Sequence, residues 1–276
     1  MHLSLTELER EAYRKSPIHG IEGRIKILIT VIIVLYAVAL PRVDALNFTK
    51  LGFIEAYLLI LLFLAKLEFK YLAIRFALAM PFGLGIAVLQ PFIKQPFFRD
   101  FTVMYTMPMG LEITLEGMMF GANLLAKFIV CITAIIFLSS TASMSELVAS
   151  ARRLGLPKEL ALLFTMMVRY LFVFWNMLVR IRTAQKTRCF DIWNRKVPRK
   201  WTLEQIGYTI SSLFIRSYEQ GERTYQSMLC RGYSAEAHVY VGKKNIRVFD
   251  VIILVVTSGV VIGAQIGLKL LEVFLS

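Results

Sequence analysis

The side chains that most often perform chemistry in proteins are few in this chain and lie far apart. They are three histidines and three cysteines: His2, His19, His238, Cys131, Cys189 and Cys230. A metal site requires several nitrogen, sulfur or oxygen donors that converge on one point, and none of these residues stands near another at such a spacing. The chain also lacks a phosphate-binding loop, a zinc-protease motif and a nucleophile elbow. We therefore expect no catalytic residue, no resident metal and no cofactor, and we expect the cysteines to be free thiols.

Two arginines are of interest because each follows a long helical pattern. Arg188 lies in QKTRCFDIWN (185–194) and Arg231 lies in SMLCRGYSAE (227–236), with an aromatic residue two positions after each. A cation at a helix C-terminus stabilises the helix by some tenths of a kcal/mol, which gives one structural reason for both residues. A guanidinium on a helix end is also well shaped to pair with a carboxylate on a partner. The residues alone favour neither reading.

The composition indicates a membrane protein. Apolar residues make up 57% of the chain and the mean hydropathy is +0.62, whereas soluble domains are about 45–50% apolar. The excess lies in blocks, and a bilayer-spanning helix needs roughly 20 such residues. Pro81, Gly83 and Gly85 predict a kink or break in the third block. The predicted spans are 27–40, 51–65, 71–93, 117–140 and 251–268.

The positive charge lies mostly between residues 142 and 247. This region holds 18 Lys and Arg against 7 Asp and Glu, so 18 − 7 gives +11 of the total +13. Basic loops remain in the cytoplasm, so this region and the N-terminus are predicted to lie on the cytoplasmic side of the cell membrane. The predicted domains are 1–140 with four spans, 141–247 as a basic cytoplasmic domain, and 248–276 with the last span. A nucleic-acid partner is not expected, because topology explains the charge, but the lipid bilayer attracts the same cations.

The basic region is predicted to be helical. A short helix is expected over 141–157, a long helix runs from Pro157 past Arg188, and an amphipathic helix covers 202–232. The segment 157–186 is apolar enough for a sixth span. We prefer a helix under or partly within the bilayer, because spanning places Arg169 near mid-bilayer at a cost of several kcal/mol. The fold class is thus an all-α integral membrane protein with five transmembrane helices, or six if 157–186 spans.

Two features inside the spans allow further readings. Gly259, Gly263 and Gly267 recur every fourth residue and favour a close helix-packing face. Lys127, with Asn123 one turn earlier, is the only candidate residue for a substrate site within the membrane, as in a secondary carrier or an intramembrane enzyme. A structural role for Lys127, by snorkelling or by pairing with a neighbouring helix, is the favoured alternative.

Two longer segments carry a resemblance to a known family. They are SPIHGIEGRIKIL (16–28), before the first span, and SSTASMSELVASARRLGLPKELALLFTMMVRYL (139–171), which leads into the first long helix. The chain resembles the transmembrane T component of energy-coupling-factor (ECF) transporters, in particular the CbiQ-type protein of cobalt and nickel importers. The resemblance covers most of the chain.

The resemblance implies a role for the two arginines. Family members carry two Ala-Arg-Gly motifs at the ends of two crossing coupling helices, and the arginines dock into grooves on two ATPase subunits. The matching positions here are Thr187-Arg188-Cys189 and Cys230-Arg231-Gly232, with Cys189 in place of glycine as the larger departure. Arg188, Arg231 and Gly232 are accordingly the expected ATPase-docking residues.

The resemblance also implies partners and a division of labour. Two ABC-type ATPases hydrolyse ATP, and a substrate-binding membrane S component, CbiM-like and accompanied in some systems by a small CbiN-like subunit, holds the cargo. The T component would be a non-catalytic scaffold that transmits motion between them. Vitamin-importing relatives use similar T components, so the cargo stays open between cobalt, nickel and a vitamin.

Overall fold

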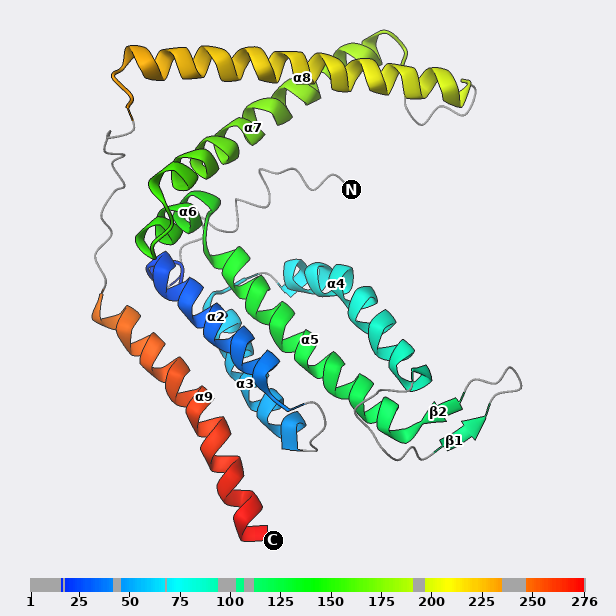
Figure 1. Ribbon diagram of the computed structural model, residues 1–276, viewed down its shortest axis with the longest axis vertical. Coiled ribbons are helices and arrows are strands. Elements are labelled where there is room, and N and C mark those ends of the chain that lie inside the picture. The colour runs from blue at the N-terminus through cyan, green and yellow to red at the C-terminus, as the bar shows by residue number, and fades with distance from the viewer. Residues whose placement is uncertain are drawn as a thin grey trace. The chain divides into compact units, whose positions relative to one another are not determined.

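The computed structural model describes residue 16 and residues 18–41, 46–67, 69–93, 103–106, 112–190, 197–234 and 247–275 (Figure 1). The fold is all-α, as the sequence predicts, with one small strand pair added. The elements group into two compact units, and each is described by itself.

The first unit contains most of the helices. Its elements are α2 (Gly23–Ala39), α3 (Leu46–Leu64), α4 (Phe69–Leu89), the 3-10 turn η1 (Gln90–Phe92), β1 (Val103–Thr106), β2 (Glu112–Thr114), α5 (Leu115–Thr141), α6 (Met144–Arg153) and α9 (Val248–Leu275).

Helix α5 is the centre of the first unit, and it packs against α2, α3 and α4 (Figure 1). On α2 the buried residues recur every fourth position, at Ile25, Ile29, Ile33 and Ala37. This spacing places them on one helix face, which meets Phe137 of α5 and the leucines of α3 in a single core cluster. The order of apolar residues along α2 therefore orients it in the unit.

Among the residues that the structure describes, five helices are long and apolar enough to cross a membrane by length and composition. They are Asn47–Leu64, Tyr71–Phe92, Leu115–Thr141, Lys158–Thr187 and Val248–Ile266. Four of them correspond to predicted spans, and the fifth is the segment for which the sequence left spanning open. The predicted span at 27–40 forms α2, whose 17 residues extend only about 26 Å at 1.5 Å per residue. Pro81 lies inside α4, which continues through it as one helix.

Polar side chains inside the apolar helices contact each other across helix pairs. Thr133 of α5 donates to Glu55 of α3 at 2.7 Å. Tyr57 of α3 and Thr257 of α9 share a hydrogen bond of 2.7 Å. A polar group left without a partner in an apolar surrounding costs several kcal/mol. These contacts therefore fix which helices are neighbours more specifically than apolar packing alone.

The N-terminal end of α5 makes a close approach to α4 and η1. A Cβ added to Gly121 would lie 2.7 Å from the carbonyl oxygen of Ala87, and one added to Gly117 would lie 2.9 Å from the Cα of Pro91. Both contacts involve backbone atoms, which cannot move aside cheaply. The preceding strands β1 and β2 form an antiparallel pair that the sequence analysis did not predict.

The glycines of α9 do not make such a contact. No atom lies within 4 Å of a Cβ built on Gly259 or Gly263. The two residues instead line an open apolar groove of about 580 Å³ between α3 and α9. The expectation of a close packing face is therefore not met within the described part of this chain, and the side chains around Gly267 lie outside it.

The second unit consists of α7 (Lys158–Thr187) and α8 (Arg199–Cys230). Two hydrogen bonds set their register: Tyr170 contacts Thr224 at 2.5 Å, and Gln185 donates to Thr209 at 2.6 Å. A later residue of α7 thus meets an earlier residue of α8, so the helices run antiparallel where they cross. Their C-termini consequently lie at opposite ends of the pair.

Candidate docking site at two helix ends

Helix α7 ends in a Schellman motif, in which two backbone hydrogen bonds close the last turn. The N–H of Phe190 donates to the carbonyl of Gln185, and the N–H of Cys189 donates to that of Lys186, both at 3.0 Å. Arg188 is the C-cap residue. The next residue, Cys189, has a φ of 59°, the left-handed conformation that this motif requires and that glycine adopts most readily. Cys189 thus takes the backbone position at which the resemblance leads us to expect glycine.

Helix α8 ends in the same motif. The N–H of Tyr233 donates to the carbonyl of Met228 at 3.0 Å, and the N–H of Gly232 donates to that of Leu229 at 2.9 Å. Arg231 is the C-cap residue, and Gly232 follows with a φ of 76°. The two predicted docking motifs are therefore alike in backbone hydrogen bonding, although only one of them contains glycine.

Both arginines are exposed, and the antiparallel arrangement separates them. Gln185, near the end of α7, contacts Thr209, and 22 residues of α8, about 33 Å at 1.5 Å per residue, lead from Thr209 to Arg231. Within the described residues no hydrogen bond or ion pair engages either guanidinium. The structure thus does not bring the two predicted residues together. The two cationic helix ends lie at opposite ends of the helix pair.

The surroundings of the two tips differ. At the α7 tip, Phe190 packs edge-to-face on Trp201 at the start of α8, with ring centroids 5.3 Å apart. This aromatic contact ties the turn to the neighbouring helix. At the α8 tip, the corresponding aromatic residue is Tyr233, which is half-buried.

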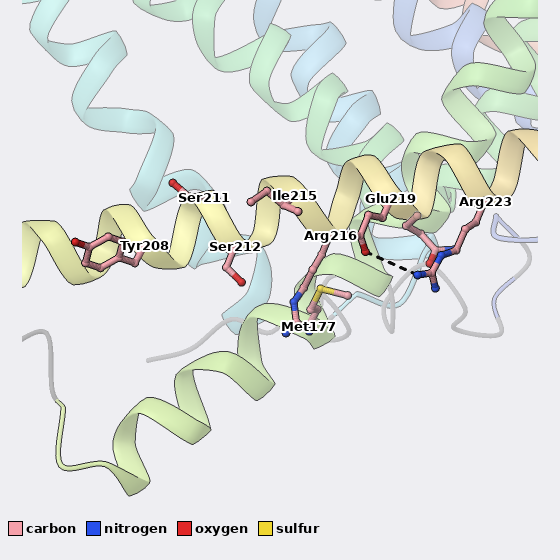
Figure 2. A pocket seen from close by; sticks show the side chains of 9 residues that line it. Met177, Tyr208, Ser211, Ser212, Ile215, Arg216, Glu219 and Arg223 are labelled. Carbon is pink, nitrogen blue, oxygen red and sulfur yellow. Dashed lines mark ion pairs between the residues drawn. The ribbon is translucent and has the colours of Figure 1, made fainter.

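A groove of about 660 Å³ lies between α7 and α8 (Figure 2). Met177 comes from α7, and the other lining residues come from α8. Glu219 and Arg223 form an i,i+4 ion pair there, at 3.8 Å. Both of these side chains are mostly exposed, so the pair contributes well under about 1 kcal/mol. The groove holds no arrangement of nucleophile and base.

A buried polar contact joins the two segments that carry the family resemblance. The carboxylate of Glu22, before α2, accepts from Arg153 at the end of α6 at 2.7 Å and from Arg24 at 2.7 Å. The Glu22 side chain is 2% exposed. A buried carboxylate is tolerable only when it is paired, so this contact holds α6 against the start of α2.

Lys26 makes a second contact of this kind and is fully buried. Its ammonium donates to the carbonyl of Thr141, the last residue of α5, at 2.7 Å, and lies 3.7 Å from the carboxylate of Glu146 on α6. A cation at this position offsets the negative end of the α5 dipole. Gly23 allows the close approach, because a Cβ there would lie 2.3 Å from the hydroxyl of Ser150.

The contacts of Glu22, Lys26 and Arg153 are not predictable from the sequence pattern. The available signal was the occurrence of charged residues within two otherwise apolar motif segments. Nothing in the spacing along the chain indicates which of the basic residues around 152–158 meets Glu22. The packing of α6 on α2 determines that Arg153 is the residue that pairs with Glu22.

Lys127 has a structural partner. Its ammonium donates to the carbonyl of Leu40 at 2.7 Å, and Leu40 is the C-cap residue of α2. The last carbonyls of a helix have no partner within the helix, so a lysine from a neighbouring helix can satisfy one of them. This contact supports a structural role for Lys127 in joining two helices, rather than a role in a substrate site.

Potential metal ligands do not cluster in the described part of the chain: no three His, Cys, Asp or Glu side chains there could hold an ion together. His19 shares a hydrogen bond of 2.7 Å with Ser16, while His2 and His238 lie outside the described residues. The three cysteines are free thiols, as predicted.

Comparison with known proteins decides the family. Residues 14–241 match the model of CbiQ, described as a cobalt transport protein. The chain belongs to the CbiQ family. The matched region includes both motif segments and both helix ends with Arg188 and Arg231, whereas α9 lies beyond it. Family membership and the apolar helices together establish a multi-pass membrane component of cobalt transport.

Two similar proteins occur in Methanocaldococcus jannaschii. Uncharacterized protein MJ1571 is 26% identical over 239 residues, which cover 86% of this chain and 78% of that protein. Uncharacterized protein MJ1089 is 26% identical over 207 residues, which cover 71% of this chain and 74% of that protein. Both alignments extend over most of each chain, so this CbiQ-family protein shares its general organisation with them.

Proposed function

We propose that this chain is the T component of an ECF-type importer for cobalt or nickel ions. It is a membrane scaffold that passes the conformational change of two ABC-type ATPases to a separate substrate-binding membrane subunit. ATP is bound by the ATPases and the cargo by the substrate-binding subunit, CbiM-like in this family. The chain itself performs no chemical step, and its N-terminus lies in the cytoplasm.

The observation that carries the proposal is the likeness of the two helix ends. Each places an exposed arginine at the C-cap of a Schellman motif, and the motif holds the backbone around the arginine in one conformation. A preorganised cation loses little conformational freedom when it pairs with a carboxylate, which favours binding. The antiparallel crossing of α7 and α8 separates the two arginines, which supports docking to two different ATPase subunits.

The polar contacts around Glu22 and Lys26 support the transmission of force. They attach α6 to α2 and α5, and only residues 154–157 separate α6 from α7. A force applied to α7 by an ATPase therefore reaches, through this short connection, a helix that is anchored in the membrane unit by buried charges.

The test is charge reversal at the two tips. The double variant Arg188→Glu, Arg231→Glu should no longer co-purify with the ATPases and should no longer support uptake of cobalt ions. Its insertion into the membrane should stay intact. Loss of one buried charge pair at an interface costs about 2–5 kcal/mol, so roughly a thirtyfold or greater loss of affinity is expected for each tip.

Arg216→Glu is the matched control, because Arg216 is exposed on α8 but lies away from both ends. It should leave ATPase binding and uptake near the wild-type level. Unchanged ATPase binding in the Arg188, Arg231 double variant would refute the docking role. Uptake that proceeds without any ATPase would refute the scaffold function as a whole.

A further inference from the structure

Lys50 is a buried cation in an otherwise apolar part of α3. It lies in the second turn of this helix and is 6% exposed. Within the described residues no hydrogen bond or ion pair engages its ammonium. A buried charge is costly unless an opposite charge or a hydrogen-bond acceptor compensates it. Lys50 therefore calls for an anion that the described part of this chain does not supply.

Lys50 lies on the face of α3 that meets α9. Tyr57 follows seven residues later, at almost the same angle around the helix, and shares a hydrogen bond with Thr257 of α9. Asn47, one turn before Lys50, is fully buried and donates to the carbonyl of Pro41 at 2.8 Å. This contact fixes the start of α3. The stem of Lys50 is thus held at the boundary between α3 and α9.

The apolar groove of about 580 Å³ between α3 and α9 opens close to Lys50. Thr49 and Phe53, which precede and follow Lys50 on α3, line one wall. Gly259 and Gly263 belong to the opposite wall, and no atom lies within 4 Å of a Cβ built on either of them. Thr49 has the one polar side chain among the lining residues. The groove is therefore an apolar channel with a buried cation next to it.

Lys50 lies near one end of the apolar span and not at its middle. The span in α3 is Asn47–Leu64, and the three residues from Asn47 to Lys50 advance about 4.5 Å along the helix axis. A lysine near the end of a span extends its ammonium toward the lipid headgroups. The anion closest to this depth in a membrane is the phosphate of a phospholipid.

We propose that an anionic phospholipid binds at this site. One acyl chain lies in the groove between α3 and α9, against Phe53 and the two glycines, and the phosphate pairs with the ammonium of Lys50. A zwitterionic phospholipid binds less tightly, because its headgroup also carries a cation, which Lys50 repels. The lipid then supplies the anion that Lys50 calls for.

The charge and depth of Lys50 favour lipid over protein as the occupant. A second copy of this chain that used the same groove around a two-fold axis would bring two Lys50 side chains toward each other, and like charges repel. A helix of another protein would have to place a carboxylate at the same level, and the groove offers it little hydrogen bonding besides Thr49. A phospholipid carries an acyl chain and a phosphate at the required depths.

The test measures quenching of tryptophan fluorescence by brominated lipids. The full chain is reconstituted without partners in vesicles of phosphatidylcholine and phosphatidylglycerol, of which only one is brominated on its acyl chains. Phe53→Trp places a reporter in the groove, in a background without the native tryptophans (Trp175→Phe, Trp193→Phe, Trp201→Phe). At this reporter phosphatidylglycerol should bind about fivefold more tightly than phosphatidylcholine, as expected for one cation near an anionic lipid.

A second reporter, Phe82→Trp, provides the control. Phe82 is 73% exposed on α4 and lies outside the groove, so the two lipids should quench a tryptophan there equally well. Lys50→Gln should bring the binding ratio at the Phe53→Trp reporter close to one and leave the Phe82→Trp reporter unchanged. Lys50→Arg keeps the positive charge and should keep the preference for phosphatidylglycerol.

The role of the groove is tested by filling it. Gly259→Leu with Gly263→Leu places two large side chains in the open space and should reduce quenching of the Phe53→Trp reporter by both lipids. Undiminished quenching with the same preference would show that the acyl chain does not use the groove, and would overturn the proposal.

Two other outcomes would also overturn it. An equal ratio in the wild-type and Lys50→Gln proteins would remove the role of the cation. A Phe53→Trp reporter that neither lipid quenches, beside a Phe82→Trp reporter that both quench, would show that protein covers the groove. None of these measurements involves the ATPases or the cargo, so the result does not depend on the proposed function.

Discussion

Glu22 and Arg153 are 131 residues apart in the chain, and their side chains meet at 2.7 Å in a nearly closed interior. One residue precedes α2 and the other ends α6, so the pair joins the start of the membrane unit to the last helix before α7. Arg24 shares the same carboxylate oxygen. The contact connects two segments that identify the family in the sequence.

Breaking this pair should destabilise the protein. Arg153→Ala removes one of the two arginines that donate to the buried carboxylate of Glu22, so the free energy of unfolding should fall by about 2–4 kcal/mol. The measurement is the thermal midpoint of the detergent-solubilised protein. Glu219→Gln, at an exposed ion pair on α8, should change stability by less than about 0.5 kcal/mol. Equal effects of the two substitutions would contradict the assigned role of burial.

Introducing glycine at the end of α7 and removing it at the end of α8 should have opposite effects on stability. Cys189→Gly should raise the free energy of unfolding of the α7 end by about 1 kcal/mol, because glycine adopts a positive φ without steric cost. Gly232→Ala should lower that of the α8 end by a similar amount. Amide hydrogen exchange of Phe190 and Tyr233 measures each end separately. Faster exchange at Phe190 in Cys189→Gly would refute the assignment of strain to Cys189.

Lys127 should matter for stability and not for cargo recognition. Lys127→Leu removes the donor to the Leu40 carbonyl and should cost about 1–3 kcal/mol of unfolding free energy. Lys127→Gln retains an N–H donor and should cost less. Metal-ion selectivity of uptake should be the same in all three proteins, measured as the ratio of cobalt to nickel transported. A changed ratio would restore Lys127 as a candidate for a substrate site.

The glycines of α5 and α9 form a matched pair of tests. Gly121→Ala pushes a methyl group against the backbone of α4 and should cost about 1–3 kcal/mol. Gly263→Ala enters open space in the groove between α3 and α9 and should change the stability of the isolated chain by less than about 0.5 kcal/mol. The comparison uses unfolding midpoints of the two variants. A larger loss in Gly263→Ala would mean that α9 packs more closely than described.

Sequence reasoning correctly predicted the helices, because apolar blocks and Gly or Pro stops are local signals. The ends of α7 and α8 at Arg188 and Arg231 follow from such signals. It did not predict the strand pair β1–β2. It also expected a packing face at Gly259 and Gly263, whereas the close backbone contacts occur at Gly117 and Gly121.

The amino-acid sequence by itself determined the membrane class, the basic region and the two arginine tips, since composition and periodicity are properties of the chain alone. Only the tertiary structure decided that Cys189 takes the left-handed position of a glycine. It likewise decided that Arg153 pairs with Glu22 and that Lys127 satisfies the end of α2. These facts depend on contacts between segments far apart in the chain. The spacing of residues along one helix contains no information about which backbone or side chain it will meet.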